Sequence, residues 1–99
     1  MRYRIDFAES VEEHLRFLTA ADRTKVLDMI EKQLIYEPLV ETRNRKLMRP
    51  NPLAPWELRL GDLRVFYDVG ADEADTVRIL AVGEKRGNKL FIAGKEIML

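Results

Sequence analysis

The feature that most constrains the fold of this chain is the alternation of apolar and polar residues over residues 56–69. Apolar side chains occupy every second position on both sides of a Gly61–Asp62 pair: Trp56, Leu58, Leu60, Leu63, Val65, Tyr67 and Val69. A period of two indicates strands with one buried face, and a Gly-X pair favours a two-residue turn of type II′. The sequence therefore predicts a β-hairpin in which Arg59 lies opposite Arg64 and Glu57 lies opposite Phe66.

The segments around this hairpin predict a single α+β domain over residues 1–99. Alternation at residues 3–7 indicates a strand, and apolar residues at helical spacing indicate a helix over residues 9–19. A second helix is expected from Asp22 as N-cap to a stop before Pro38, and residues 76–82 read as a central strand. The predicted order is β-α-α-β-β-β plus a short C-terminal element. It corresponds to an N-terminal strand and an antiparallel helical hairpin packed on a mainly antiparallel four-stranded sheet.

Three other segments are less regular. Residues 39–55 hold three of the four prolines and are expected to form an ordered loop, with a short strand or turn near residues 46–48. Gly83 indicates a bulge or a close approach of another segment, and residues 86–88 indicate a turn. The sequence leaves open whether residues 90–99 form strands.

Composition narrows the classes of function. The chain has no cysteine, which excludes disulfides and thiolate metal sites, and its one histidine makes a zinc site or a Ser-His triad unfavourable. That histidine, His14, has no apparent catalytic partner and is typical of a boundary position on a helix. No apolar run approaches the ~20 residues that span a bilayer, and no signal-peptide core follows the N-terminus. We expect a cytoplasmic protein with no metal, no small-molecule cofactor and no membrane contact.

The charge is balanced in total but uneven along the chain. The 17 basic and 17 acidic residues give a net charge of zero, which argues against strong non-specific binding of nucleic acid. Residues 1–42 carry six basic and nine acidic side chains, whereas residues 43–99 carry eleven basic and eight acidic ones. Six basic residues lie within residues 43–64: Arg43, Arg45, Lys46, Arg49, Arg59 and Arg64. Either this segment meets an anionic partner, or its first part is only a solvated loop.

The polar face of the hairpin is the candidate for chemistry. It is expected to carry Glu57, Arg59, Arg64 and Phe66, on the side turned away from the helices. Two opposed arginines repel each other, and either Glu57 or a bound phosphate would relieve that repulsion. One interpretation is an anion site beside a carboxylate, with Phe66 stacking on a nucleobase. The alternative is an ordinary solvated sheet face, with Phe66 packed against Phe91 or the tail.

Two stretches resemble the RelE/ParE family of toxins. Residues 56–69, WELRLGDLRVFYDV, are similar to the core hairpin of these toxins, and Val82-Gly83-Glu84-Lys85 is similar to the end of their "VGxR/K" strand. Residues 3–8 and the Lys46–Leu47 step also fit, so the similarity spans essentially the whole chain in the right order. The resemblance implies a RelE-like fold and the toxin of a type II toxin–antitoxin system, with a cognate antitoxin as partner.

The resemblance also implies a reaction. RelE-like members cut messenger RNA in the ribosomal A site without metal, by attack of a ribose 2′-OH on the adjacent phosphate. The resemblance assigns Arg64 to the scissile phosphate, Lys85 to the basic position after the Val-Gly step, and Arg59 to a basic position on the preceding strand. The expected RNA-binding residues are Arg43, Arg45, Lys46, Arg49, Phe66 and Phe91.

The sequence departs from RelE at two of these places. Glu57 stands where RelE has a catalytic lysine, and Phe91 falls near its C-terminal tyrosine. Three hypotheses follow: a ribosome-dependent endoribonuclease with Glu57 as general base, a ParE-like inhibitor of DNA gyrase, or a degenerate interaction module. Under the first hypothesis the antitoxin is expected to dock in the apolar groove outside the helices and at the edge near residues 90–99.

Overall fold

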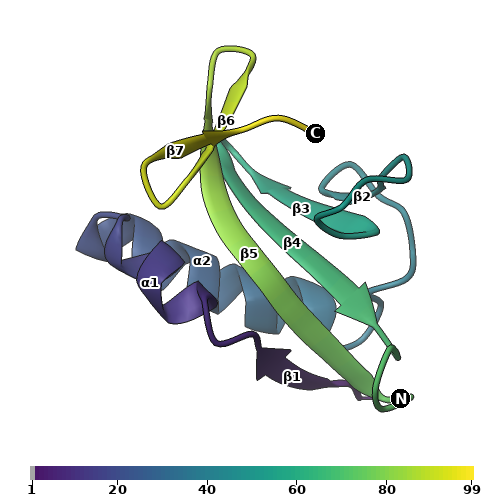
Figure 1. Cartoon of the computed structure of the whole chain (residues 1–99). Helices are drawn as coiled ribbons and strands as arrows, with labels where there is room; N and C mark the ends of the chain where they lie inside the picture. The colour runs from purple at the N-terminus through teal and green to yellow at the C-terminus, as the bar shows by residue number, and fades with distance from the viewer. Residues whose placement is uncertain (1) are drawn as a thin grey trace.

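The sheet is organised around one long strand, β5 (Thr76–Arg86), in a computed structural model that describes residues 2–99. Strand β4 (Leu63–Val69) pairs antiparallel with one edge of β5. The other edge is shared, because β1 (Arg4–Phe7) pairs parallel with the first half of β5 and β6 (Lys89–Ile92) pairs antiparallel with its end. The strand order is β2-β3-β4-β5-β6-β7, with β1 beside β5 (Figure 1).

The predicted hairpin is present with the predicted register. It joins β3 (Trp56–Leu60) to β4, and it places Arg59 opposite Arg64 and Glu57 opposite Phe66. Gly61 has a φ of 59°, whereas Asp62 is not in the left-handed region, which is the combination that a type II′ turn requires. The alternation of residues 56–69 was therefore sufficient to place the charged face of this hairpin.

The described residues form seven strands, where the sequence predicted four and a short C-terminal element. The additional strands are β2 (Arg45–Leu47), β6 and β7 (Lys95–Ile97), of three or four residues each. Pairing with a neighbour defines these three strands, and among them the sequence indicated only β2, as a short strand or turn near residues 46–48. The chain turns between β5 and β6, as predicted for residues 86–88. The tail, whose form the sequence left open, folds into β6 and β7.

Both helices lie on one face of the sheet, but their ends differ from the prediction. Helix α1 (Val11–Arg16) is shorter than the predicted span. Helix α2 (Ala20–Leu34) begins after Thr19, whose Oγ1 accepts the Asp22 N–H at 3.1 Å. Asp22 is therefore not the N-cap; it sits in the first turn, where a carboxylate is also favourable. The Arg23 guanidinium donates to the Leu15 and Leu18 carbonyls. These carbonyls, at and just after the end of α1, therefore have hydrogen-bond partners.

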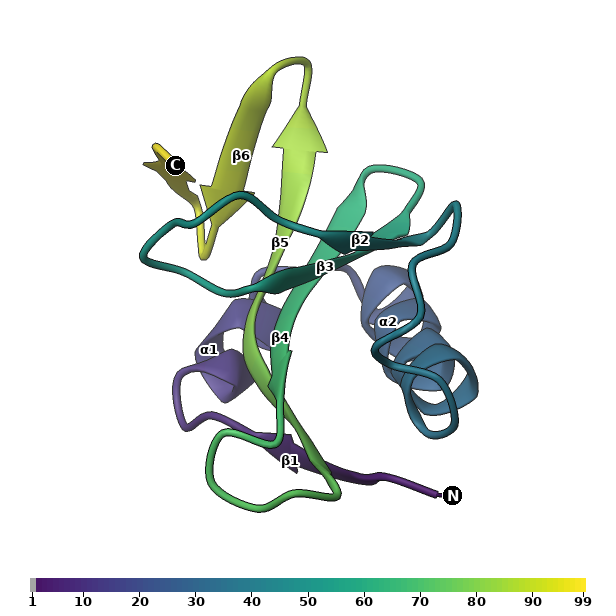
Figure 2. The same ribbon diagram turned by 90° about the vertical axis from the view of Figure 1, so that its right-hand side faces the viewer.

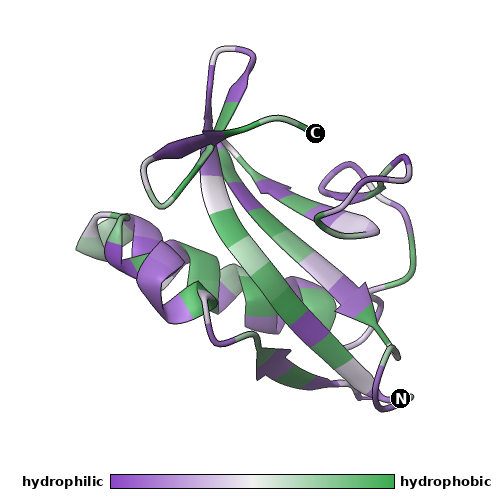
Figure 3. Cartoon of the chain, in the orientation of Figure 1, coloured by the Kyte–Doolittle hydropathy of each residue, from purple (hydrophilic) through white to green (hydrophobic). Residues whose placement is uncertain are grey.

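The sheet separates two hydrophobic clusters. The main core lies between the helices and the sheet, and includes Val26, Ile30, Leu58, Val65 and Tyr67. A smaller second core lies on the opposite face of the sheet and consists of Ala54, Phe66, Ala81, Leu90 and Ile92. Figure 2 shows the helices and the β2–β3 segment on different sides of β4 and β5, and Figure 3 shows apolar residues concentrated on these central strands.

Neither helix within residues 2–99 has the length and apolarity that crossing a membrane requires.

Candidate functional site

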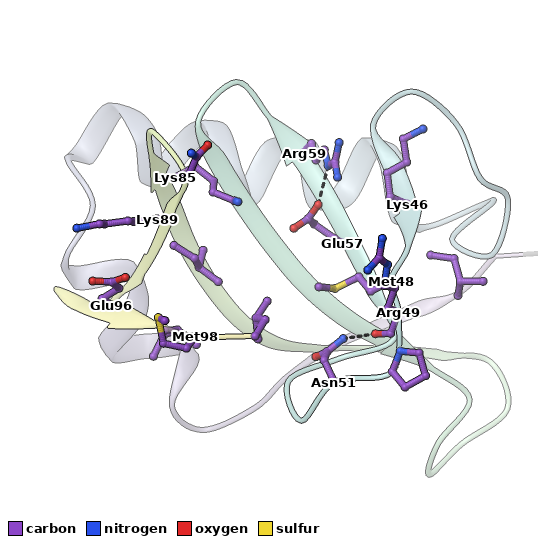
Figure 4. A pocket seen from close by; sticks show the side chains of 16 residues that line it. Lys46, Met48, Arg49, Asn51, Glu57, Arg59, Lys85, Lys89, Glu96 and Met98 are labelled. Carbon is purple, nitrogen blue, oxygen red and sulfur yellow. Dashed lines mark hydrogen bonds and ion pairs between the residues drawn. The ribbon is translucent and has the colours of Figure 1, made fainter.

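A cleft of about 700 Å³ opens on the face of the sheet that the helices do not cover. It lies between the β2–β3 segment on one side and the β5–β6–β7 segment on the other (Figure 4). Its polar lining residues are Lys46, Arg49, Asn51, Glu57, Arg59, Lys85, Asn88, Lys89 and Glu96. The size is within the range of small-ligand sites.

The cleft concentrates positive charge on a chain whose net charge is zero. Five of the lining side chains are basic and two are acidic, so the cleft has a formal charge of +3. Lys46 and Arg49 come from the β2 side, Arg59 from β3, Lys85 from β5 and Lys89 from β6. Convergence of cations from four elements favours an anionic ligand with several charged groups.

Glu57 is a buried carboxylate held between two guanidinium groups. Its residue is 6% exposed. Its Oε1 accepts from Arg59 Nε at 2.6 Å, and its Oε2 lies 3.9 Å from Arg64 Nε. The predicted relief of the Arg59–Arg64 repulsion by Glu57 is therefore realised in the structure.

The two arginines differ in their access to a ligand. The Arg59 side chain is half exposed and lines the cleft, where it points outward beside Glu57 (Figure 4). The Arg64 side chain is 15% exposed, and its Nη1 donates to the Gly61 and Leu63 carbonyls at 2.6 and 2.9 Å. Arg64 does not line the cleft, and its buried Nε has no hydrogen-bond partner among residues 2–99, whereas Arg59 presents its charge to the cleft.

Lys85 reaches the cleft from β5 because Gly83 lets β6 approach closely. A Cβ at Gly83 would overlap the Phe91 carbonyl oxygen and lie 2.8 Å from Ile92 Cγ1. The Lys85 N–H also donates to the Asp62 carbonyl at 2.7 Å, which ties this end of β5 to the hairpin turn. Gly83 is thus the predicted close approach, and it sets the position of Lys85.

The wall opposite β6 is a rigid loop built around Asn51. The amide of Asn51 donates to the Arg49 and Ala54 carbonyls at 2.7 and 2.9 Å, and its Oδ1 accepts from the N–H groups of Leu53 and Ala54. Met48 is fixed by its own N–H, which donates to the Pro55 carbonyl at 2.8 Å. Four side-chain hydrogen bonds within one loop hold Arg49 and Met48 at the cleft.

Two of the residues predicted to bind RNA, Arg45 and Phe66, are buried, so this prediction is wrong for them. Arg45 lies inside the β2 loop, where it donates to the Val40 carbonyl at 2.9 Å and to both the carbonyl and the side chain of Gln33. Phe66 is fully buried in the second core, so packing and not stacking on a base explains this aromatic ring. For Phe66 this is the packing alternative that the sequence left open, because its cluster includes Leu90 and Ile92 of the tail.

Two further predicted residues lie away from the cleft. Phe91 lies under the Arg86 guanidinium, whose Cζ is 4.9 Å from the ring centroid, and it borders a small hollow near His14 on the helix-covered face. Its neighbour Leu90 faces the cleft instead, as alternation along β6 requires. Arg43 is exposed in the loop before β2 but does not line the cleft.

His14 is structural, as predicted. Its Nδ1 accepts the Val82 N–H at 3.2 Å, which ties α1 to β5. Burial lowers the pKa of His14, and the neighbouring Glu13 carboxylate opposes part of that effect. Trp56 and Tyr67 are also core residues, with stacked rings 6.0 Å apart.

The sequence did not predict the cleft residues of β6, β7 and the following tail, including Lys89, Glu96 and Met98. The only sequence feature that pointed to these residues was the short apolar tail at residues 90–99, for which the sequence left open whether it forms strands. Across residues 2–99 there is no group of three or more His, Cys, Asp or Glu side chains arranged to hold a metal ion.

Comparisons with known proteins bear on this fold and cleft. No protein-family model and no curated protein matches the sequence. Among solved structures, the chain is similar to one from the RelBE2 toxin–antitoxin complex of Mycobacterium tuberculosis, with 27% identity, a TM-score of 0.71, and coverage of 86% of this chain and 100% of that one.

Two further structures are similar. A chain of the RelE–RelB complex from Pyrococcus horikoshii has 26% identity and a TM-score of 0.54, over 88% of this chain and 98% of that one. A mutant of the Escherichia coli toxin RelE, bound to an antitoxin peptide, has 24% identity and a TM-score of 0.64, over 88% and 87% of the two chains, and supports the fold alone. The hairpin register, the element order and these likenesses show that the chain has the fold of the RelE toxins in these toxin–antitoxin complexes.

Proposed function

We propose that this chain is the toxin of a type II toxin–antitoxin system and that it cleaves messenger RNA on the ribosome without a metal ion. The likeness to chains of solved toxin–antitoxin complexes supports the first part. The observation that carries the second part is the buried Glu57 carboxylate, which lies between two guanidinium groups at a cationic cleft. The proposed substrate places the reaction in the cytoplasm.

The cleft residues supply the three groups that the reaction needs. Glu57 accepts the proton of the ribose 2′-OH while that oxygen attacks the adjacent phosphorus. The bond from phosphorus to the 5′-oxygen breaks, and Lys85 gives that oxygen a proton. The products are a 2′,3′-cyclic phosphate and a 5′-hydroxyl end.

The two arginines of the hairpin have different proposed roles. Arg59 is half exposed beside Glu57, so it stabilises the negative charge that develops on the phosphorane oxygens. Arg64 is largely buried and bonded to backbone carbonyls, so we assign it to positioning Glu57. Lys46, Arg49 and Lys89 line the same cleft and bind the phosphates on either side.

The test is expression of the chain without antitoxin, followed by mapping of messenger RNA ends in translating cells. New 5′-hydroxyl ends inside codons support the nuclease. A DNA-damage response with intact messenger RNA would contradict the nuclease and support inhibition of DNA gyrase. Normal growth would contradict both activities and support an interaction module.

We further propose that the antitoxin covers the apolar groove between β1 and α2. Its apolar lining residues are Tyr3, Ile5, Phe7, Leu27, Ile30 and Ile35. Leu27 is 39% exposed there, so Leu27→Glu leaves the core intact but places a charge in the interface. We expect this variant to stay toxic and to escape neutralisation by co-expressed antitoxin, whereas Lys25→Glu, on an exposed part of α2, is neutralised normally.

A further inference from the structure

The cleft has two halves of different chemistry. The cationic half contains Arg59, Lys85 and Lys46 around the Glu57 carboxylate. The other half carries the apolar lining residues Met48, Leu90, Ile97, Met98 and Leu99, with Arg49 beside Met48 and Glu96 beside Met98 (Figure 4). A ligand that fills both halves has anionic groups joined to an apolar body.

The apolar half is an extension of the second core. Leu90 belongs to that core, and Met48 and Ile97 pack against it. Met98, at the end of β7, is 82% exposed and stands at the rim. Figure 4 shows Met48 and Met98 on opposite sides of the cleft.

No aromatic side chain lines the described part of this cleft, because Phe66 is buried and Phe91 faces the other side of the sheet. Methionine is the aliphatic residue best suited to contact a flat aromatic ring, since its sulfur is polarizable and its side chain adapts to the ring position. A nucleobase is a flat ring on a chain of phosphates, which matches the two halves of the cleft in order.

We propose that Met48 and Met98 form a base-binding subsite, in which a nucleobase next to the scissile phosphate packs between the two thioethers. The proposal rests on the proposed function, because the ligand is an RNA strand whose phosphate lies at Arg59 and Lys85. It assigns a role in binding substrate to Met98, which directly follows β7. It also makes these two methionines the residues that discriminate between larger and smaller bases at that position.

The test is a titration of protein labelled with ¹³C in the methionine methyl groups. The probe is a ribodinucleotide with a 2′-deoxy sugar at the attack position, which removes the nucleophile and prevents cleavage. We expect the methyl resonances of Met48 and Met98 to shift upfield by the ring current of the base. Met29, which packs on the main core from α2, is the internal control and stays unmoved.

The matched probe is the same phosphodiester with abasic sugars, which binds the cationic half but carries no ring current. Met98→Ser, at an exposed site, is expected to weaken binding of the base-bearing probe roughly tenfold and to leave the abasic probe unchanged. Met48→Leu keeps the apolar volume and retains most of the binding. Unmoved Met48 and Met98 methyl groups, or equal affinity for the two probes, would overturn the subsite.

Different results would contradict the proposed nuclease and the proposed base-binding subsite. Methyl shifts without messenger RNA cleavage in cells would contradict the nuclease and leave the base subsite standing. Cleavage in cells with the same codon pattern in wild type and Met98→Ser, together with unmoved methyl groups, would contradict the subsite and leave the nuclease standing.

Discussion

At the scale of single residues, the site depends on how one carboxylate is held. Glu57 is almost fully buried and has a guanidinium on each side, one exposed to the cleft and one behind it. Removing one partner of such a group leaves the others buried without compensation, which costs more than the intact pair contributes. The same contacts that orient the proposed base therefore also stabilise the hairpin.

Glu57→Gln is expected to lower the free energy of unfolding by about 1–3 kcal/mol. Glutamine keeps one hydrogen bond to Arg59 but leaves Arg59 and Arg64 directly opposite each other with no negative charge between them. Urea unfolding monitored by the fluorescence of Trp56 measures the change. Asp62→Asn, at an exposed position in the turn of the same hairpin, is the control and is expected to stay within about 0.5 kcal/mol of wild type.

A second residue-scale prediction concerns His14 and pH. Its Nδ1 accepts the Val82 N–H, so only the neutral imidazole makes this bond, and burial lowers the pKa of His14 below its ordinary value of 6.5. The unfolded chain therefore takes up the proton first as the pH falls. The stability that this residue contributes is complete above pH 6.5 and declines as the pH drops through 6.5 toward the lower pKa of the folded state.

The measurement compares unfolding free energies of wild type and His14→Gln at about pH 8 and about pH 5. Glutamine still offers an acceptor to Val82 but does not titrate. We expect wild type to lose more stability than the variant over this interval. An equal loss in both proteins would show that His14 does not sense pH.

At the scale of elements, the strands with long patterns could be predicted, whereas β6 and β7 could not, and β2 was indicated only as a short strand or turn near residues 46–48. Seven alternating apolar positions in residues 56–69 fix both the hairpin and its register. By contrast, β2, β6 and β7 form because their backbones pair with a neighbouring strand. Three residues are too few for a period of two to predict such pairing. The residues missed in the site come from these short elements for that reason.

The junction of β5 and β6 supplies an element-scale prediction. Gly83→Ala would place a methyl group against the Phe91 carbonyl and Ile92, and would push β6 away from β5. We expect a loss of about 1–3 kcal/mol in unfolding free energy and faster hydrogen exchange at the β6 amides. Gly87→Ala is the matched control in the same hairpin: it meets no atom within 4 Å, so it reports only the strain of a positive φ. A smaller loss at Gly83 than at Gly87 would contradict the close-approach argument.

At the scale of the whole molecule, the sheet has a structural face and a chemical face. The helices bury the first against the main core, and the second carries the cationic cleft over the smaller core. The sequence predicted the α+β class and which hairpin residues share the chemical face, because both follow from alternation. For Phe66 it left open both stacking on a base and packing against the tail, and the second core realises the packing. Arg45 was expected to bind RNA, but it is buried by its hydrogen bonds to Val40 and Gln33, which are distant in the pattern of the sequence.

The central claim is that a carboxylate between two arginines takes the proton from a ribose hydroxyl. Mapping of messenger RNA 5′ ends after expression of wild type and Glu57→Gln, matched for the amount of folded protein, tests it most directly. We expect 5′-hydroxyl ends within codons for the wild type, and a loss of at least about a hundredfold in their frequency for the variant, the scale of one general base. The same ends at the same frequency in both proteins would contradict the account.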